Sequence, residues 1–324
     1  MNTTATVGID IASASFKAAL WLDAQRCINA QFDNHVGGFR KLGIWLKRHG
    51  FGRLRVGLES TNTYGEALAE WLHDHGYEVL LLNPERVLRY AQCRGQRNKT
   101  DPADARLIAE FVARHDDLTR WFPPTAEQKV LRALTRTRTQ LVEQRKQLAS
   151  QLRTAHPAAQ PYLRAAINTV AEQIKLIARQ ITEHLRRWPQ WHEQVRRVMT
   201  VKGVGLITAV TLLAELPPIT HTTDPRSICA WVGLIPRRHQ SGNLELPAHI
   251  ARKGNVHIRN ALFMPALVAK RYNPLLRAFA KRLEQSNKTH RAILGAIAHK
   301  MLRIIVGLLR SGTDFDPNWS FVRS

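Results

Sequence analysis

The sequence predicts an α/β domain followed by a mainly helical region. Residues 1–120 alternate short apolar runs, such as TVGIDIA and RLRVGLE, with segments of helical spacing. This alternation is typical of a layered α/β sheet. Beyond residue 125 the apolar residues recur at helical intervals over long segments. With 324 residues, 44% of them hydrophobic, the chain is long enough to build more than one core.

The first part contains the elements expected of such a sheet. The helix at 101–114 opens with Asp101, a good capping residue, then Pro102 at the first helical position and Asp104 in the first turn. The sequence WFPPT marks a break before residue 126. The other expected elements are strands within 4–32, at 53–59 and at 77–82, and helices at 38–49, 63–75 and 84–92.

The second part begins with two long helices, the first at 126–155 and ended by HPAAQP. In the next helix the apolar residues follow alternate steps of three and four: Ile167, Val170, Ile174, Ile177, Ile181 and Trp188. This seam fits a coiled coil, and it fits equally a helix packed on its own domain. We expect three domains, at 1–125, 126–190 and 191–324.

The third region is expected to be helical around one irregular segment. Residues 199–216 predict two helices joined by a Gly203-Val204-Gly205 turn. This turn is either helix-hairpin-helix-like, with backbone amides that approach a phosphate, or an ordinary packing corner. The segment WVGLIPRRHQSGN at 231–243 predicts a strand and then a loop. Further helices follow to Arg310, and the last dozen residues predict a loose tail.

The charge of the chain points to a polyanionic partner. There are 48 Lys and Arg residues against 25 Asp and Glu, a formal net charge of +23, and the pI is near 10.9. Such a surplus is neutralised most simply by nucleic acid. The most apolar segment, 292–309, contains His299, Lys300 and Arg303, which a bilayer would disfavour. It therefore predicts a buried or interface helix, and we expect no membrane partner.

The cysteines indicate a reducing compartment. Cys27, Cys93 and Cys229 are odd in number and far apart, so they match neither a disulfide framework nor a zinc site. We expect a bacterial cytoplasmic protein.

Four carboxylates form the candidate catalytic centre. Asp10 and Glu59 end predicted strands, and the carboxyl ends of neighbouring strands meet at one crevice. Asp101 and Asp104, three residues apart, share one face of a helix. Like charges in such number stay ionised only beside cations, and two Mg²⁺ ions can hold both the attacking and the leaving oxygen of a phosphodiester. Taken singly, each acid has a structural alternative: Asp10 as a turn former at a strand end, Glu59 as a solvated residue before a helix, and Asp101 with Asp104 as a helix start.

A serine and several cations form the second candidate group. Ser241 lies in RRHQSGN, and most serines in Ser-Gly turns carry no chemistry. A serine hydroxyl needs activation, and no His/Asp partner with hydrolase spacing is evident, so the metal site is the economical activator. The cations that can bind phosphates flanking the attacked bond are Arg237, Arg238, Arg252 and Lys253.

Taken together, these motifs resemble a known family. GIDIA, GLESTNTY and RNKTDPADAR in the first part, and GVGLITA, WVGLIPRRHQSG and RKGNVHIRNALF in the second, occur in order and cover nearly the whole chain. The sequence resembles the DEDD recombinases of the IS-one-ten and IS-eleven-eleven insertion sequences, which include the Piv-type DNA invertases. The chain departs from the family pattern at Asn62, Ala248, His249 and Ala251.

The resemblance implies a fold and a mechanism. It implies a RuvC-like, RNase H-type domain with the acidic quartet Asp10, Glu59, Asp101 and Asp104, a coiled-coil segment as subunit contact, and a C-terminal transposase domain. It implies Ser241 as a nucleophile that forms a phosphoserine link to DNA. It further implies a structured guide RNA that pairs with donor and target DNA in a dimer-to-tetramer assembly. The candidate RNA contacts lie in the basic segment 129–153: Arg136, Arg138, Arg145 and Lys146.

Three rival functions remain at this point. A metal-dependent nuclease or hydrolytic transposase would use water in place of Ser241. A non-catalytic nucleic-acid-binding protein would need neither group. A tyrosine recombinase is disfavoured, because none of the five tyrosines lies in an Arg/His constellation.

Overall fold

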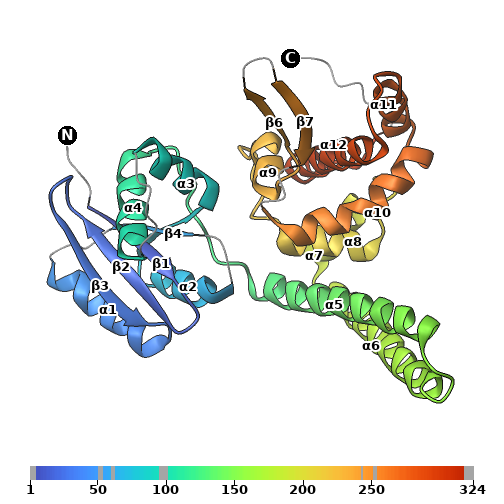
Figure 1. The fold of residues 1–324 in the computed structure, drawn as a ribbon, viewed down its shortest axis with the longest axis horizontal. Coiled ribbons are helices and arrows are strands. Elements are labelled where there is room, and N and C mark those ends of the chain that lie inside the picture. Colours follow the sequence, from blue (N-terminus) through green and yellow to red (C-terminus); the bar gives the residue numbers. More distant parts are fainter. Residues whose placement is uncertain are drawn as a thin grey trace. The chain divides into compact units, whose positions relative to one another are not determined.

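The chain folds into two compact units, residues 1–123 and 124–324 (Figure 1). The computed structural model describes residues 5–49, 54–59, 63–94, 101–241, 244–250 and 254–316, and for residues 85, 101–103 and 236–250 it describes the backbone alone. The division falls between Pro123 and Pro124, inside WFPPT. Each unit has hydrophobic clusters of its own.

The first unit is built on a mixed five-stranded sheet with the order β3-β2-β1-β4-β5. The neighbours β1–β2 and β2–β3 pair antiparallel, whereas β4 runs parallel to β1 and β5 parallel to β4. The parallel neighbours are separated in the chain by helices, as crossover connections require. All five predicted strands are present: β1 (Thr6–Ile11), β2 (Ser15–Trp21), β3 (Cys27–Asp33), β4 (Arg55–Glu59) and β5 (Glu78–Leu82).

Helices cover both faces of this sheet. α1 (Val36–Arg48) and α2 (Glu66–Asp74) lie on one face, where their leucines join the buried cluster of Phe16 and Leu20. α4 (Asp101–Arg114) lies on the other face, where Ala105 and Ala109 share a buried cluster with Ala19 and Trp21. The unit is completed by α3 (Pro84–Cys93) and a short 3-10 helix at Thr63–Gly65.

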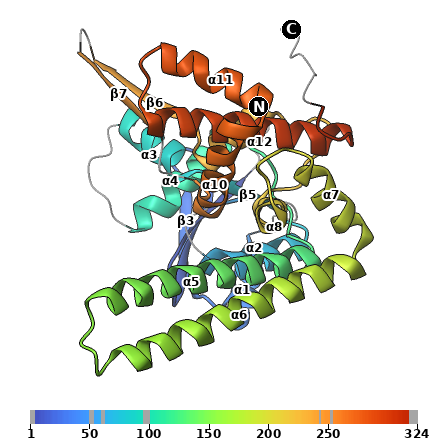
Figure 2. The same cartoon turned by 90° about the vertical axis from the view of Figure 1, so that its right-hand side faces the viewer.

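The second unit starts with α5 (Ala126–Thr154) and α6 (Gln160–Arg187), an antiparallel helical hairpin (Figures 1 and 2). Thr125 caps α5, since its hydroxyl accepts from the Gln128 backbone N–H at 3.2 Å. Along the predicted seam of α6, Val170, Ile174 and Ile181 are at most 9% exposed. Burial inside the chain accounts for this seam, so its use as a subunit contact remains a prediction.

The remaining helices pack around α12 (His290–Ser311), which lies at the centre of the largest buried cluster. Among the helices in the described part of the chain, α12 alone is long and apolar enough to cross a membrane. Ile297, Met301 and Ile305 are fully buried, however, which identifies α12 as a core helix and confirms that expectation. Its neighbours are α7 (Pro189–Met199), α9 (Pro225–Val232), α10 (Val256–Tyr272) and α11 (Pro274–Gln285), whereas α8 (Leu206–Glu215) packs on α5, α7 and α10.

The predictions for residues 231–243 are partly wrong. Trp231 and Val232 end helix α9, because Asp224 caps that helix, Pro225 takes its first position and Gly233 ends it at φ +80°. The segment that follows is no loop, because β6 (Pro236–Ser241) and β7 (Leu244–Ile250) pair antiparallel. In the sequence the two residues between them are Gly-Asn, which is a hairpin signal.

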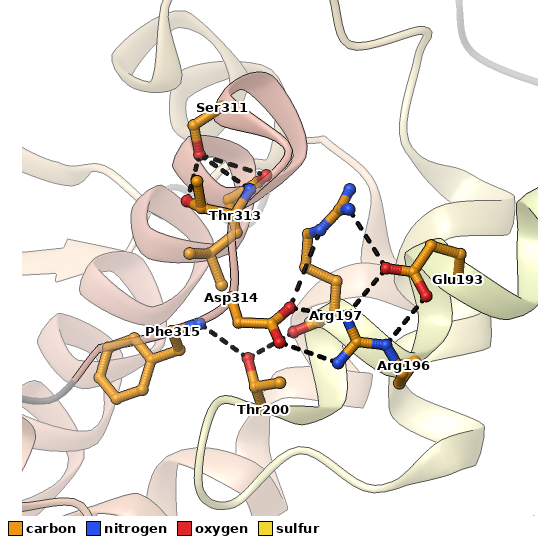
Figure 3. A network of polar contacts seen from close by, with 9 residues as sticks. Glu193, Arg196, Arg197, Thr200, Ser311, Thr313, Asp314 and Phe315 are labelled. Atoms are coloured by element: carbon orange, nitrogen blue, oxygen red, sulfur yellow. Dashed lines mark hydrogen bonds and ion pairs between the residues drawn. The ribbon is translucent and has the colours of Figure 1, made fainter.

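The expected loose tail is also wrong for the part that the structure describes, residues 313–316. Arg196 of α7 binds both carboxylate oxygens of Asp314, at 2.8 and 2.9 Å (Figure 3). The same guanidinium binds Glu193, and the Thr200 hydroxyl accepts from the Phe315 backbone N–H at 2.9 Å. The hydrogen bond from Arg196 lowers the pKa of Asp314. This segment is therefore fastened to α7, and residues 317–324 lie outside the described part.

Candidate active site

Asp10 and Glu59 lie at the same end of two neighbouring strands. β1 and β4 run parallel in a register that pairs Thr6 with Arg55 and continues to Ile9 with Leu58. One step further along each strand come Asp10 and Glu59. Because parallel strands end at the same edge of a sheet, both carboxylates are presented at the carboxyl end.

Both side chains point toward the face that α4 covers. On β1, the Thr6 hydroxyl donates to the Ala109 carbonyl at 2.8 Å, and a Cβ on Gly8 would lie 2.1 Å from the Ala105 carbonyl oxygen. On β4, a Cβ on Gly57 would lie 2.5 Å from Val112 of the same helix. Since side chains alternate across a sheet, Asp10 and Glu59, each two residues further on, share this face.

The direction of α4 places its first turn beside Asp10. Moving from Thr6 to Gly8 along β1, the contacts on α4 move back from Ala109 toward Ala105, so the helix runs antiparallel to the strand. Four residues of helix before Ala105 span about 6 Å. The two residues of strand beyond Gly8 span about 6.6 Å, so the start of α4 lies over the strand end. Asp104 therefore lies at the same end of the sheet as Asp10 and Glu59. The backbone of Asp101 lies one helical turn before Asp104.

A closed metal cluster is not present among these side chains. Within the described residues, no three His, Cys, Asp or Glu side chains lie close enough together to hold one ion. The side chain of Asp101 falls outside those residues, so the fourth member of the quartet and its capping role stay predictions. The arrangement nevertheless suits a hard cation, since the three described groups are carboxylates at one end of one sheet face.

Ser241 is the last residue of β6, at the tip of a hairpin in the second unit. It pairs with Leu244, and the pairing extends to Pro236 and Ile250 at the base of the hairpin. A shift in register between Arg237 and His239 interrupts the ladder, which indicates a bulge. For Arg237 and Arg238 only the backbone is described, and Arg252 and Lys253 lie outside the described residues. Their phosphate contacts remain predictions.

Comparison with known proteins identifies the family. Residues 7–157 match a profile described as "Transposase", and residues 195–281 match the "Transposase IS116/IS110/IS902 family". The pilin gene-inverting protein of Moraxella bovis is 31% identical over 319 residues, which cover 96% of this chain and 97% of that protein. The transposase for insertion sequence element IS1111A of Coxiella burnetii is 28% identical over 268 residues, 72% of each chain.

The chain belongs to the IS116/IS110/IS902 family of transposases. It is accordingly a transposase, an enzyme of DNA recombination. The family match confirms the motif resemblance found in the sequence. The substrate of a transposase is DNA.

The acidic end of this transposase includes a lysine that the sequence reading missed. Lys17 of β2 is the cross-strand partner of Asp10. Directly opposite residues in an antiparallel pair point to the same face, with Cβ atoms about 5 Å apart. Ala19 and Trp21, on the same side of β2, share a buried cluster with residues of α4. The alternation in SFKAALW shows that Lys17 faces away from Phe16, and only the register shows that it lies opposite Asp10.

Arg136, expected to contact RNA, has a structural role in the transposase. Its Nε and Nη2 donate to the two carboxylate oxygens of Glu215, at 2.7 and 3.0 Å. One turn earlier on α5, Arg132 donates to the Ala214 carbonyl, and Gln128 donates to three carbonyls at the end of α8. These side chains satisfy carbonyls that a helix end leaves without partners. Arg136 therefore fastens α5 to α8, which argues against the predicted RNA contact.

The other basic residues of α5 differ from Arg136. Arg138 has a buried Nε with no hydrogen-bond partner, and burial followed by the nearby Arg145 lowers the pKa of its guanidinium. Arg145 is exposed. Lys146 is exposed and pairs with Glu143, three residues away, at 2.7 Å. Two neighbouring arginines would suit a phosphate, and the RNA contacts of Arg138, Arg145 and Lys146 stay predictions.

The two glycines of the predicted helix-hairpin-helix serve different purposes. Gly203 has φ +107°, and a Cβ there would lie 2.8 Å from the Pro265 carbonyl oxygen, so close packing on α10 explains it. Gly205 is the N-cap of α8, makes no side-chain capping bond, and has open space around its Cα. The packing-corner interpretation therefore accounts for Gly203, and a phosphate contact at Gly205 stays a prediction.

Proposed function

We propose that this transposase exchanges DNA strands through Ser241 and the acidic residues Asp10, Glu59, Asp101 and Asp104. The observation that carries the proposal is the convergence of Asp10, Glu59 and the start of α4 at the carboxyl end of one sheet face. Open α/β folds place their chemistry in such a crevice. The mixed sheet order supports assigning this unit to the RuvC-like, RNase H-type class.

The acidic residues are proposed to hold two Mg²⁺ ions. Carboxylate oxygens are the ligands that Mg²⁺ prefers. Bound there, the ions would stabilise charge on the phosphate and on the attacking and leaving oxygens. Within the protein, the tight contact of α4 with Gly8 fixes Asp104 relative to Asp10 and gives the site its shape.

In the proposed reaction the Ser241 hydroxyl oxygen attacks the phosphorus of a DNA backbone linkage. A serine–phosphate ester forms while the bond from phosphorus to one deoxyribose oxygen breaks. The serine proton is lost to solvent, and the released DNA oxygen gains a proton. Attack by a hydroxyl of the other DNA reverses these steps and rejoins the strands. The ester conserves the bond energy, so rejoining needs no further co-reactant.

The relatives favour strand exchange over simple cutting. The Moraxella proteins are named for inverting a pilin gene, and inversion requires both cutting and rejoining. We further propose that a structured guide RNA pairs with donor and target DNA, and that a dimer or tetramer assembles on them. The net charge of +23 supports an extended polyanionic partner.

The role of Ser241 is tested by trapping the covalent product. Ser241→Ala is compared with Ser286→Ala, an exposed serine at the end of α11, using labelled donor DNA. We expect a protein–DNA adduct and recombinant product from the wild type and from Ser286→Ala, and neither from Ser241→Ala. Recombination by Ser241→Ala would establish the hydrolytic alternative.

The acidic site is tested by neutralising one carboxylate. Asp104→Asn is expected to abolish strand cleavage while salt-sensitive DNA binding persists. Asp116→Asn is the control, because Asp116 is a fully exposed residue of the same unit. Recombination in magnesium-free chelator would rule out the metal role.

Guide RNA is tested by sequencing the nucleic acid that co-purifies with the transposase. A single RNA species with segments complementary to both donor and target DNA is the expected result. Host RNA without such complementarity would contradict guidance and leave the strand-exchange proposal standing.

A further inference from the structure

A buried carboxylate lies at the start of α10, the helix that follows the Ser241 hairpin in the sequence. Glu215, the last residue of α8, has a side chain only 1% exposed. Its carboxylate accepts two hydrogen bonds from Arg136 and a third, at 2.9 Å, from the side-chain amide of Asn255. Burial acts to raise the pKa of Glu215, but the bonds from Arg136 and Asn255 outweigh it, so the pKa is lowered and the group is ionised. We call the three hydrogen-bonded residues Arg136, Glu215 and Asn255 the clamp.

Asn255 joins the clamp to the first turn of α10. Its amide nitrogen is bound to Glu215, while its amide oxygen caps α10 by accepting from the Ile258 backbone N–H at 3.1 Å. The preceding Gly254 has φ +118°, and a Cβ there would lie 2.5 Å from the Trp231 carbonyl oxygen. Arg259 donates to the Val232 carbonyl at 2.8 Å. The start of α10 is thus fixed against the end of α9.

The serine hairpin is connected in sequence to the two segments that these contacts hold. β6 begins three residues after Gly233, which ends α9, and β7 ends five residues before Asn255. From Pro236 to Ser241 the strand extends about 17 Å. A tilt of about 10° at the base would displace the tip by about 3 Å. A misplacement of about 1 Å can lower a catalytic rate by roughly a hundredfold.

We propose that Glu215 and Asn255 are positioning residues that aim the Ser241 hairpin. The contacts of the clamp are directional and mutually dependent, whereas an apolar contact in the same place would tolerate sliding. A buried ion pair adds little stability over apolar packing, and fixing one geometry is its better-supported use. The inference rests on the proposed nucleophilic role of Ser241.

A substitution at Asn255 can separate its effect on the direction of the Ser241 hairpin from its role as the cap of α10. Asn255→Asp retains a good capping oxygen for α10, but it replaces the amide donor by a second carboxylate facing Glu215. We expect a tenfold to hundredfold loss of cleavage rate with unchanged DNA affinity. Asn255→Asp combined with Glu215→Gln restores a donor and an acceptor in reversed order, and should recover the rate to within about threefold.

The matched control is Asn273→Asp. Asn273 is a buried asparagine that caps α11, accepting from Leu276 N–H at 3.3 Å, and it takes no part in the clamp. The cleavage rate of each variant is measured at a temperature the same number of degrees below that variant's own Tm. An equal rate loss in Asn273→Asp would overturn the inference, because general destabilisation would then explain the effect.

The hairpin direction is measured independently of catalysis. Nitroxide labels at Glu245→Cys on β7 and Lys281→Cys on α11, with Cys27 and Cys93 replaced by serine, report the distance between hairpin and helical core. Asn255→Asp should shift or broaden the distance distribution, and the double variant should restore it. An unchanged distribution would overturn the clamp. A changed distribution with an unchanged rate would instead overturn the catalytic role of Ser241.

Discussion

At the residue scale, Lys17 places a positively charged side chain beside the acidic residues. It lies opposite Asp10 on the face that α4 covers, and Glu59 ends the next strand on the same face. A lysine there offsets repulsion among the carboxylates. We expect the same charge to compete with a bound cation and to attract a DNA phosphate.

Replacing this lysine should therefore change metal binding and catalysis in opposite directions. In Lys17→Ala we expect Mn²⁺, used as a spectroscopic substitute for Mg²⁺, to bind at least about fivefold more tightly, because a charge at roughly 4 Å contributes about 1 kcal/mol or more. Cleavage at saturating metal should fall. Mn²⁺ titration followed by electron paramagnetic resonance measures the first effect, and Lys41→Ala, exposed on α1, is the control. Weaker Mn²⁺ binding would contradict the assigned role.

At the scale of elements, the packing of α4 on β1 decides where the acids meet. The helix approaches so closely that a methyl group on Gly8 would overlap the Ala105 carbonyl oxygen and the Ala109 backbone nitrogen, at 2.1 and 2.3 Å. Neither atom belongs to a flexible side chain. The helix itself must move to accommodate any larger residue.

Gly8→Ala should thus damage both stability and the acidic site. We expect a loss of about 3 kcal/mol in the free energy of unfolding of the first unit, together with weakened Mn²⁺ binding because Asp104 is displaced. Gly65→Ala is the control, since a Cβ there meets nothing nearer than 3.8 Å. Denaturant unfolding and Mn²⁺ titration check the two effects, and wild-type stability in Gly8→Ala would refute the close packing.

Along α5, neighbouring arginines have different roles. Arg136→Ala leaves the buried Glu215 without its cation and should cost about 3 kcal/mol in stability of the second unit.

Arg138→Ala should leave the stability of the second unit nearly unchanged. It should reduce the slope of log nucleic-acid affinity against log salt concentration by roughly 0.7 to 0.9, as expected for one lost phosphate contact. Thermal unfolding and salt-dependent binding distinguish them. Equal salt slopes for Arg138→Ala and the wild type would remove Arg138 from the interface.

At the scale of the whole molecule, the hydrophobic clusters define the folding units. The clusters of the first unit contain no residue beyond Trp121. The cluster of the second unit includes Leu131, Ile181 and Leu185 together with residues of α7 to α12. The hairpin of α5 and α6 therefore contributes to the core of the transposase's second unit.

Fragments of the chain should behave accordingly. Residues 1–123 and residues 124–324, expressed separately, should each unfold cooperatively. Residues 191–324 alone should be far less stable, because they lack the leucines and isoleucine that α5 and α6 supply to the core. Circular dichroism melts of the three fragments provide the measurement. A stable 191–324 fragment would favour the three-domain division expected from the sequence.

Much of the fold follows from local signals. Asp-Pro at the start of α4, the alternation in β2 and the Pro-Pro break are short-range features, and each predicted the observed element. The same holds for the identities of Asp10, Glu59 and Asp104, since strand ends and helix starts can be recognised from neighbouring residues. Where local signals compete, as at Trp231, the apolar run predicts a strand although Asp224 and Gly233 delimit a helix.

By itself, the sequence identified the family and most of the elements, and it predicted Asp10, Glu59, Asp101 and Asp104 as candidate site residues, because these depend on residue types at short spacing. The tertiary structure alone placed Lys17 opposite Asp10 and brought Arg136 to Glu215. Both are ordinary surface cations by local pattern. Their partners, Asp10 across a strand pair and Glu215 some eighty residues away, are brought to them by register and helix packing, which no local periodicity specifies.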